Sequence, residues 1–200
     1  MSRALLPIMR SATCAALFVL ALFTVSCSNS LFKVKPISEI PAMPASAASL
    51  NVGSLSFRAS PLLTDEQTQE LFEANLQLAG LMPVRLEVVH NSGEAIEMKK
   101  LKFRLIDGAH SSWKLISARQ AISRILKANG LTLYNPNARK TFEKEFRAYE
   151  FNAKDPLTHT EGKRQGLLIF QSENKEPVAS PKNITLTVDG LAQPVTLKLN

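Results

Sequence analysis

The sequence predicts a mainly β fold, an antiparallel β-sandwich with about three inserted helices, and two observations lead to it. First, two runs alternate apolar with charged residues, as strands with one buried and one solvent-exposed face do. Second, the turn signals Asn91-Ser92-Gly93 and Asp107-Gly108 follow these runs, and such tight turns are too short for the crossover connections of a parallel sheet. We therefore expect the runs to form a central antiparallel hairpin. Their apolar members, which should share one core, are Val84, Leu86, Val88, Leu101, Phe103 and Leu105.

The N-terminus has the features of an export signal. Two arginines precede an uncharged apolar run over residues 11–25, which is the composition of a secretory signal peptide. The next residues complete the sequence Thr-Val-Ser-Cys27, which resembles the lipobox of bacterial lipoproteins. This resemblance implies that Cys27 is lipidated and becomes the mature N-terminus. We therefore expect residues 1–26 to be a lipoprotein signal peptide that is removed.

Two other interpretations of the N-terminus stay open. One is an ordinary signal peptide cleaved near Ala45 to Ala48, with Cys27 incidental. The other is an uncleaved membrane anchor, for which the apolar run is short. Under the lipoprotein interpretation Cys27 is the only cysteine left, because Cys14 lies in the discarded run, and no internal disulfide is expected.

Residues 27–49 are predicted to form a flexible tether. They contain three prolines and many serines and alanines, without a helical or strand period, so they should bury too little surface to offset their ordering entropy. The tether should hold the folded domain, residues 50–200, away from the membrane. Ser28 resembles the outer-membrane sorting pattern of enterobacterial lipoproteins. We therefore expect a lipid-anchored protein of the bacterial cell envelope, at the outer membrane and facing the periplasm.

Capping signals and apolar spacing predict three helices in the domain. The first opens at Thr64 and the second at Ser117, each with glutamine three residues later, which is the spacing of a capping box. Asn137 is expected to cap the third helix, which should run to about Tyr149 with its apolar residues along one side.

About seven strands are predicted. Residues 50–57 suggest a first strand whose phase breaks near Gly53. Residues 166–170 form an unbroken apolar run, which suits a strand covered on both faces. Two last strands are expected at residues 184–188 and 195–199, joined by a turn.

Four segments carry a resemblance to known proteins: Glu70-Leu-Phe-Glu-Ala-Asn75, Gly80-Leu-Met-Pro-Val84, Val89-His-Asn-Ser-Gly93 and Gly166-Leu-Leu-Ile-Phe170. They are similar to a group of bacterial envelope lipoproteins of no established activity. The resemblance covers roughly residues 50–200 and implies an immunoglobulin-like β-sandwich. Its motifs concern the fold, so no catalytic residue is carried over from the group.

No combination of residues indicates catalysis or a metal site. His90, His110 and His159 are far apart and near predicted turns, so we expect solvent-exposed histidines without the spacing of a metal site. Asp107, His110 and Ser111 lie in one short connection, whereas a hydrolase triad needs groups from separate elements. There is no nucleophile-elbow motif and no glycine-rich phosphate loop. We therefore expect no enzyme, no cofactor and no metal.

Positive charge is the more informative signal, since the chain has a formal net charge of +7. The second predicted helix carries Arg119, Arg124 and Lys127 and no acid, and Lys99 and Lys100 lie on the exposed face of the expected hairpin. Nucleic acid is not expected outside the cytoplasm, so the candidate partners are anionic lipid, phosphorylated glycolipid or an acidic protein. The alternative is a solvated basic face that confers only solubility.

Five aromatic residues form a further candidate group: Trp113, Phe142, Phe146, Tyr149 and Phe151. They would line a ligand groove between the helices and the sheet, or they would pack in the core, as helices laid over a sheet require. The leading functional prediction is a membrane-anchored, non-catalytic scaffold or accessory binding subunit with an envelope protein partner. The alternative is a chaperone-like or anionic glycolipid-binding lipoprotein, and an enzyme comes last.

Overall fold

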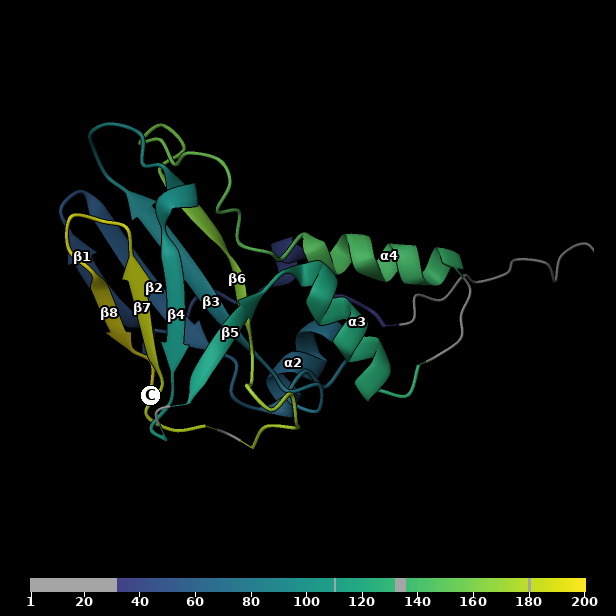
Figure 1. The fold of residues 1–200 in the computed structure, drawn as a ribbon. Helices are drawn as coiled ribbons and strands as arrows, with labels where there is room; N and C mark the ends of the chain where they lie inside the picture. Colours follow the sequence, from purple (N-terminus) through teal and green to yellow (C-terminus); the bar gives the residue numbers. More distant parts are fainter. Residues whose placement is uncertain (1–31, 110, 132–135, 180) are drawn as a thin grey trace, which may run out of the picture.

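The computed structural model describes residues 32–109, 111–131, 136–179 and 181–200, so Cys27 and the predicted signal peptide lie outside it. The described strands are β1 (Ala48–Val52), β2 (Leu55–Pro61), β3 (Leu81–His90), β4 (Lys102–Ile106), β5 (Ser112–Ile116), β6 (Lys163–Gln171), β7 (Thr185–Asp189) and β8 (Val195–Lys198). The α-helices are α2 (Asp65–Phe72), α3 (Ala118–Ala128) and α4 (Pro136–Arg147), and two short 3-10 helices are η2 (Ile37–Glu39) and η3 (Met98–Lys100). The strands occupy one end of the molecule and the α-helices the other (Figure 1).

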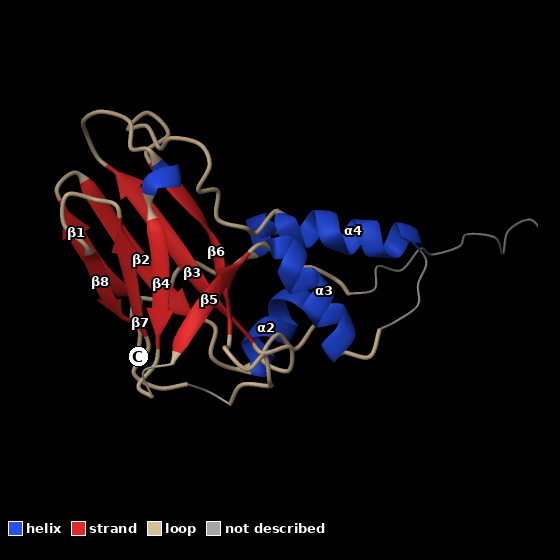
Figure 2. Cartoon of the chain, viewed as in Figure 1, coloured by secondary structure: helices blue, strands red, loops and turns tan. Residues whose placement is uncertain are grey.

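The eight described strands form one antiparallel sheet in the order β1-β2-β3-β6-β5-β4-β7-β8. The sheet curls until its two end strands, β1 and β8, lie close together without pairing (Figure 2). The predictions of a mainly antiparallel β fold and of three helices are confirmed for the described residues. The expected single strand over residues 50–57 is instead the hairpin of β1 and β2, which turns at Gly53, where φ is +60°.

The predicted central hairpin is wrong. β3 pairs with β2 and β6, whereas β4 pairs with β5 and β7. Residues 91–101 connect them across the opening of the sheet, and this connection is longer than the two to five residues or so of a tight hairpin loop. The predicted turn residues Asn91-Ser92-Gly93 therefore lie within a longer connection between β3 and β4.

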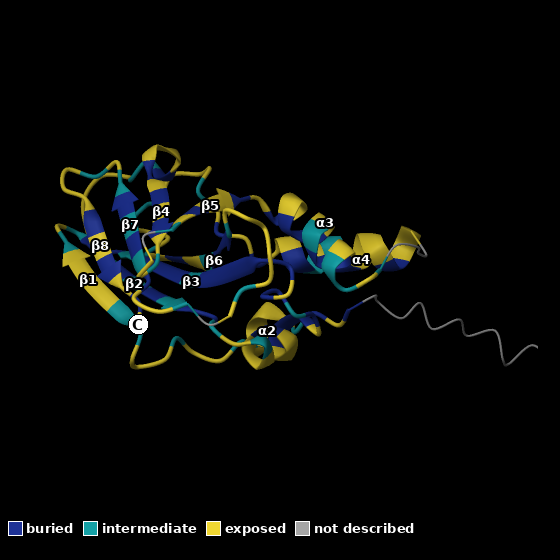
Figure 3. Ribbon diagram, turned by 60° about the horizontal axis from the view of Figure 1, so that its bottom comes forward, coloured by how far each residue is buried: buried dark blue, intermediate teal, exposed yellow. Residues whose placement is uncertain are grey.

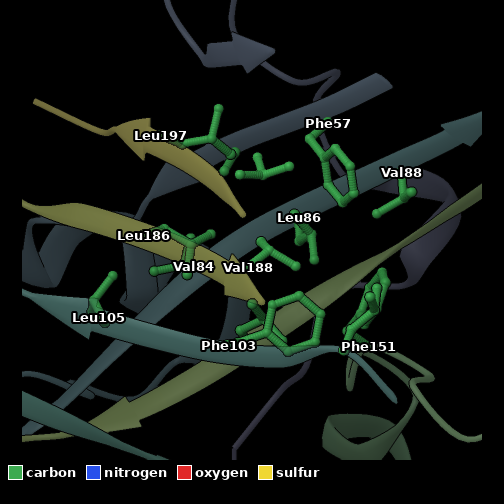
Figure 4. Packing of buried hydrophobic residues seen from close by; sticks show 14 of the residues in the cluster. Phe57, Val84, Leu86, Val88, Phe103, Leu105, Phe151, Leu186, Val188 and Leu197 are labelled. Carbon is green, nitrogen blue, oxygen red and sulfur yellow. The ribbon is translucent and has the colours of Figure 1, made fainter. Parts of the chain in front are cut away.

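The predicted shared core is confirmed, because β3 and β4 face each other across the interior of the curled sheet. All six apolar residues expected to pack together, Val84, Leu86, Val88, Leu101, Phe103 and Leu105, belong to one buried cluster. Side chains from β2, β7 and β8 complete this inner core (Figure 4). Burying one large apolar side chain contributes roughly 1.5–3 kcal/mol relative to exposure, so the inner core contributes strongly to the stability of the sheet.

A second, outer core lies between the sheet and the helices. β6 contributes to both cores, because Leu168 and Phe170 point inward while Leu167 and Ile169 point toward the helices. The prediction that residues 166–170 form a strand covered on both faces is therefore confirmed. Buried positions follow β3 and β6, whereas α3 and α4 present exposed positions to solvent (Figure 3).

The predicted capping boxes are present at the first two helices. The Thr64 hydroxyl accepts a hydrogen bond from the backbone N–H of Gln67, and the equivalent box forms at the start of α3. The third helix begins at Pro136, a residue that suits the first helical turn because its missing N–H would have no helical partner there.

Residues 32–49, which the sequence assigned to the tether, lie against the folded domain. Phe32 and Val34 are buried in the outer core, and the ring of Phe32 lies 5.1 Å from that of Phe142 in α4. The backbone N–H of Lys35 donates to the carbonyl oxygen of Leu71 at 2.8 Å. Two large apolar residues thus dock a segment whose average composition is that of a linker.

Candidate ligand-binding cavity

A cavity of about 560 Å³ lies over the outer face of β2, β3 and β6. Residues 37–43 cover it, and the residues around the end of α2 and after α4 form its sides. Its apolar lining comes from Ile37, Ile40, Met43, Leu71 and Leu167. Its ionisable lining residues are Arg58, Arg85, Glu87, Tyr149 and Lys163.

The strand register explains how Glu87 is compensated. Arg58 of β2 lies directly across from Glu87, and its guanidinium is 3.5 Å from the carboxylate. The Lys163 ammonium of β6 is 2.8 Å from the other carboxylate oxygen. Glu87 is only 7% exposed, and a carboxylate that is removed from water in this way needs such partners.

Arg85, two residues earlier on the same face, has a different environment. Ser60 lies across from it on β2 and Leu167 on β6, so no cross-strand carboxylate faces it. Its guanidinium donates to the carbonyl oxygen of Pro41 at 2.7 Å and forms no ion pair within the part of the chain that the structure describes. Burial lowers the pKa of Arg85, and the charge of Glu87 opposes this shift. The lining therefore has three cations and one carboxylate, and Arg85 is the cation that forms no ion pair with a described residue.

Tyr149 follows α4 and borders the same cavity. Its hydroxyl donates to the carbonyl oxygen of Lys35 and so fixes the covering segment to the domain. Burial is the largest cause that raises the pKa of Tyr149 to about 12; Arg85 lowers the pKa and Glu39 raises it. Tyr149 is therefore a neutral hydrogen-bond donor at physiological pH.

This arrangement is suited to binding an anionic group. A guanidinium offers several N–H donors in a planar fork that matches a carboxylate or a phosphate. The apolar residues around it would accommodate a hydrocarbon part of the same ligand.

The structure divides the basic residues predicted from sequence. Arg119 and Lys127 are exposed on α3, but the guanidinium of Arg124 donates to the carbonyl oxygens of Ala79 and Lys175 at 2.6–3.0 Å. Arg124 therefore ties two loops to α3. Lys99 and Lys100 belong to η3, which lies at the top of the sheet before β4 and away from α3 (Figure 2), and Lys99 pairs with Glu97 at 2.9 Å.

The aromatic group is divided as well. Trp113 and Phe151 belong to the inner core, whereas Phe142, Phe146 and Tyr149 belong to the outer core. Four of the five therefore pack in the cores away from the cavity over β2, β3 and β6, and only Tyr149 lines that cavity. A second cavity of about 560 Å³ lies on the other side of β6, between residues 147–155 and β4 and β5.

His90 is not the solvent-exposed turn residue that the sequence suggested. It is 2% exposed at the end of β3, and neither ring nitrogen has a hydrogen-bond partner among the described residues. Its ring lies 6.4 Å from that of His159, whose Nδ1 is 3.1 Å from the carbonyl oxygen of Gly93. His110 lies outside the described residues. Within the described ranges no three His, Cys, Asp or Glu residues gather as metal ligands would.

The sequence did not single out Arg58, Arg85 or Lys163. Its alternation placed Arg85 and Glu87 on one face of a strand, which is correct, but it assigned that face to solvent. The helices and residues 32–43 cover this face of the sheet. No local sequence pattern in the strand predicts that they do.

Comparisons with protein families, curated proteins and solved structures found no match to this chain. In the described part of the chain, no helix has the length and apolar character needed to cross a membrane.

Proposed function

We propose that the protein is a lipid-anchored, non-catalytic binding protein of the bacterial envelope, and that its cavity holds an anionic amphiphile. Arg85 carries the proposal. Its charge faces a cavity lined by both apolar and polar groups, and it forms no ion pair with a described residue, so an anionic headgroup would gain a charge-assisted hydrogen bond there. The cavity volume of about 560 Å³ falls within the range of small-molecule sites.

The anchor in this proposal is Cys27. Its support is the signal-peptide composition and the lipobox resemblance of the residues before it. Two or more acyl chains hold a protein to a bilayer far more firmly than one, since each buried methylene contributes about 0.8 kcal/mol. The outer membrane, with the domain facing the periplasm, is the proposed location.

An immunoglobulin-like sandwich is the proposed fold for the strand region. The order β2-β3-β6-β5 corresponds to strands A-B-E-D of the constant type, and β4-β7-β8 corresponds to C-F-G. On this assignment β1 is an added edge strand. The pairing of β4 with β5 at Leu105–Trp113 and Ile106–Ser112 would join the two layers at one corner.

A scaffold or accessory subunit is the second candidate function, and β1 favours it. Among the described strands β1 pairs only with β2, its five residues carry no charge, and Leu50 is 39% exposed. Such an edge can accept a strand from a partner protein once β8, which lies beside it, moves away. A stoichiometric protein in detergent extracts would support this candidate, whereas co-purifying lipid would support the first.

The test of the cavity is a displacement titration with a fluorescent fatty acid, competed by dodecanoate, dodecyl phosphate and dodecanol. We expect the two anions to compete and the alcohol to compete weakly. Arg85→Met should weaken the anions about tenfold or more, because a hydrogen bond to a charged group contributes about 1.5–3 kcal/mol.

Arg139→Met is the matched control, since Arg139 is exposed on α4 and pairs with Glu143 at 2.8 Å, away from the cavity. Equal anion affinity in the wild type and Arg85→Met would contradict the proposed site. Equal affinity for dodecanol and dodecanoate would contradict an anionic ligand.

A further inference from the structure

The distance between the proposed anchor and the folded domain is short. Phe32 is the first described residue, it is buried, and only five peptide units separate it from Cys27. A fully extended chain spans at most about 3.6 Å per residue, so Phe32 lies within ~18 Å of a lipidated Cys27. This step rests on the proposed lipidation. The composition suggested a tether of 23 residues (27–49), but the chain between Cys27 and the docked Phe32 is too short to hold the domain far from the bilayer.

The short spacer brings one particular end of the domain to the membrane. The Phe32 ring packs on Phe142 of α4, and α3 belongs to the same outer core. The helical end is thus next to the anchor, and the sheet extends away from it (Figure 1).

The same end carries the excess positive charge of the protein. Helix α3 has three cations and no acid, and α4 has four cations and two acids, so together they hold a net charge of +5. Residues 27–200 as a whole also have a net charge of +5, because the full chain is +7 and two arginines precede residue 27. The rest of the mature chain is therefore balanced.

Five of these cations are free to meet a ligand. Arg119, Lys127, Lys140, Lys144 and Arg147 are exposed and form no ion pair with any described residue. Exposed cations next to a short lipid anchor are complementary to anionic headgroups, and this electrostatic attraction adds to the anchor.

We propose that α3 and α4 form the membrane-facing surface of the domain and contact anionic lipid headgroups, with the sheet directed away from the bilayer. Ala148 and Tyr149, which directly follow α4, line the ligand cavity, so the cavity lies in the half of the domain nearer the membrane.

The test uses the lipidated protein in phosphatidylcholine vesicles with and without phosphatidylglycerol, and a fluorescent acceptor on the lipid headgroups. The lipidated Cys27 thiol is blocked, so an introduced cysteine is the single labelling site. Donors are placed at Ser123→Cys on α3 or at Gln193→Cys between β7 and β8, both of which are exposed positions. We expect stronger energy transfer from position 123 than from position 193, with the difference increased by phosphatidylglycerol and reduced by salt.

Two charge variants decide whether the basic residues are responsible. The combined change Arg119→Gln, Lys127→Gln, Lys140→Gln and Lys144→Gln should abolish the effect of phosphatidylglycerol. The matched control changes the exposed residues Lys100, Lys102, Lys182 and Lys198 to Gln at positions away from α3 and α4, and it should keep the effect.

Equal transfer from both positions, or the same response in both charge variants, would overturn the membrane-facing surface. An intact mass without acylation of Cys27 would overturn it as well, because the distance argument would be lost. Ligand binding distinguishes failure of the proposed membrane-facing surface from failure of the proposed cavity site. The helix variant should bind dodecanoate normally. Arg85→Met should lose dodecanoate binding but keep the same orientation of the domain relative to the membrane.

Discussion

At the residue scale, two positions on one strand face show how register sets electrostatics. Arg58 lies across from Glu87, whereas Ser60 lies across from Arg85. Glu87 is therefore compensated by cations of both neighbouring strands, and Arg85 has only a carbonyl oxygen. A shift of two residues in the β2 register would place Arg58 across from Arg85 instead of Glu87, whereas a shift of one residue would turn the β2 side chains to the opposite face.

Tyr149 gives a prediction about alkaline pH. Its folded-state pKa is raised from 10.0 to about 12, so burial favours the neutral phenol. The stabilisation is complete below pH 10 and is lost as pH rises toward about 12, because the unfolded state releases the proton first. In denaturant unfolding, the difference in unfolding free energy between the wild type and Tyr149→Phe should change between pH 10 and about 12. A difference that is constant from pH 9 to about 12 would contradict the buried, neutral phenol.

The burial of His90 follows from strand alternation and not from its place beside a turn. The alternation that places Val88 inward also places His90 inward, two residues later. Its position beside a turn suggested exposure, but residues 157–162 cover that end of the inner core; the backbone N–H of His90 donates to the carbonyl oxygen of Gly162 at 2.8 Å. Periodicity was the better guide because burial depends on the strand face.

At the scale of elements, local signals predicted the helices and most strands well. The caps of α2 and α3 depend on residues three positions apart, so the sequence alone contains the whole interaction. The pairing of β3 with β6 joins residues about 80 positions apart and depends on what the helices cover. No signal in residues 81–107 distinguishes a hairpin from two strands that face each other across a core.

The segment over residues 32–47 gives a prediction of its own. Phe32→Ala should lower the free energy of unfolding by ~1–3 kcal/mol, less than in a central core because the chain end can detach locally. Limited proteolysis should also cut this segment faster. Ile37→Ala is the matched control, since Ile37 is 44% exposed and its change should have little effect on either measurement. Unchanged proteolysis in Phe32→Ala would contradict docking through Phe32.

At the scale of the whole molecule, the cavity was beyond prediction from sequence. Its charged residues come from β2, β3, β6 and the residue stretch after α4, and they meet only through the sheet order and the covering segment. Net charge, in contrast, was readable, and α3 was correctly singled out as a helix without acids. The sequence did not show where the basic residues lie in the fold. η3 lies far from α3, and Arg124 donates a hydrogen bond to the carbonyl oxygen of Ala79.

The most direct test of the central claim is native mass spectrometry of the protein extracted from its own membrane. We predict a mature chain that begins at acylated Cys27 and carries one non-covalent anionic amphiphile, which is lost on collisional activation and absent from Arg85→Met. A wild-type chain without such a ligand, or an Arg85→Met chain that retains it, would contradict the proposed binding function.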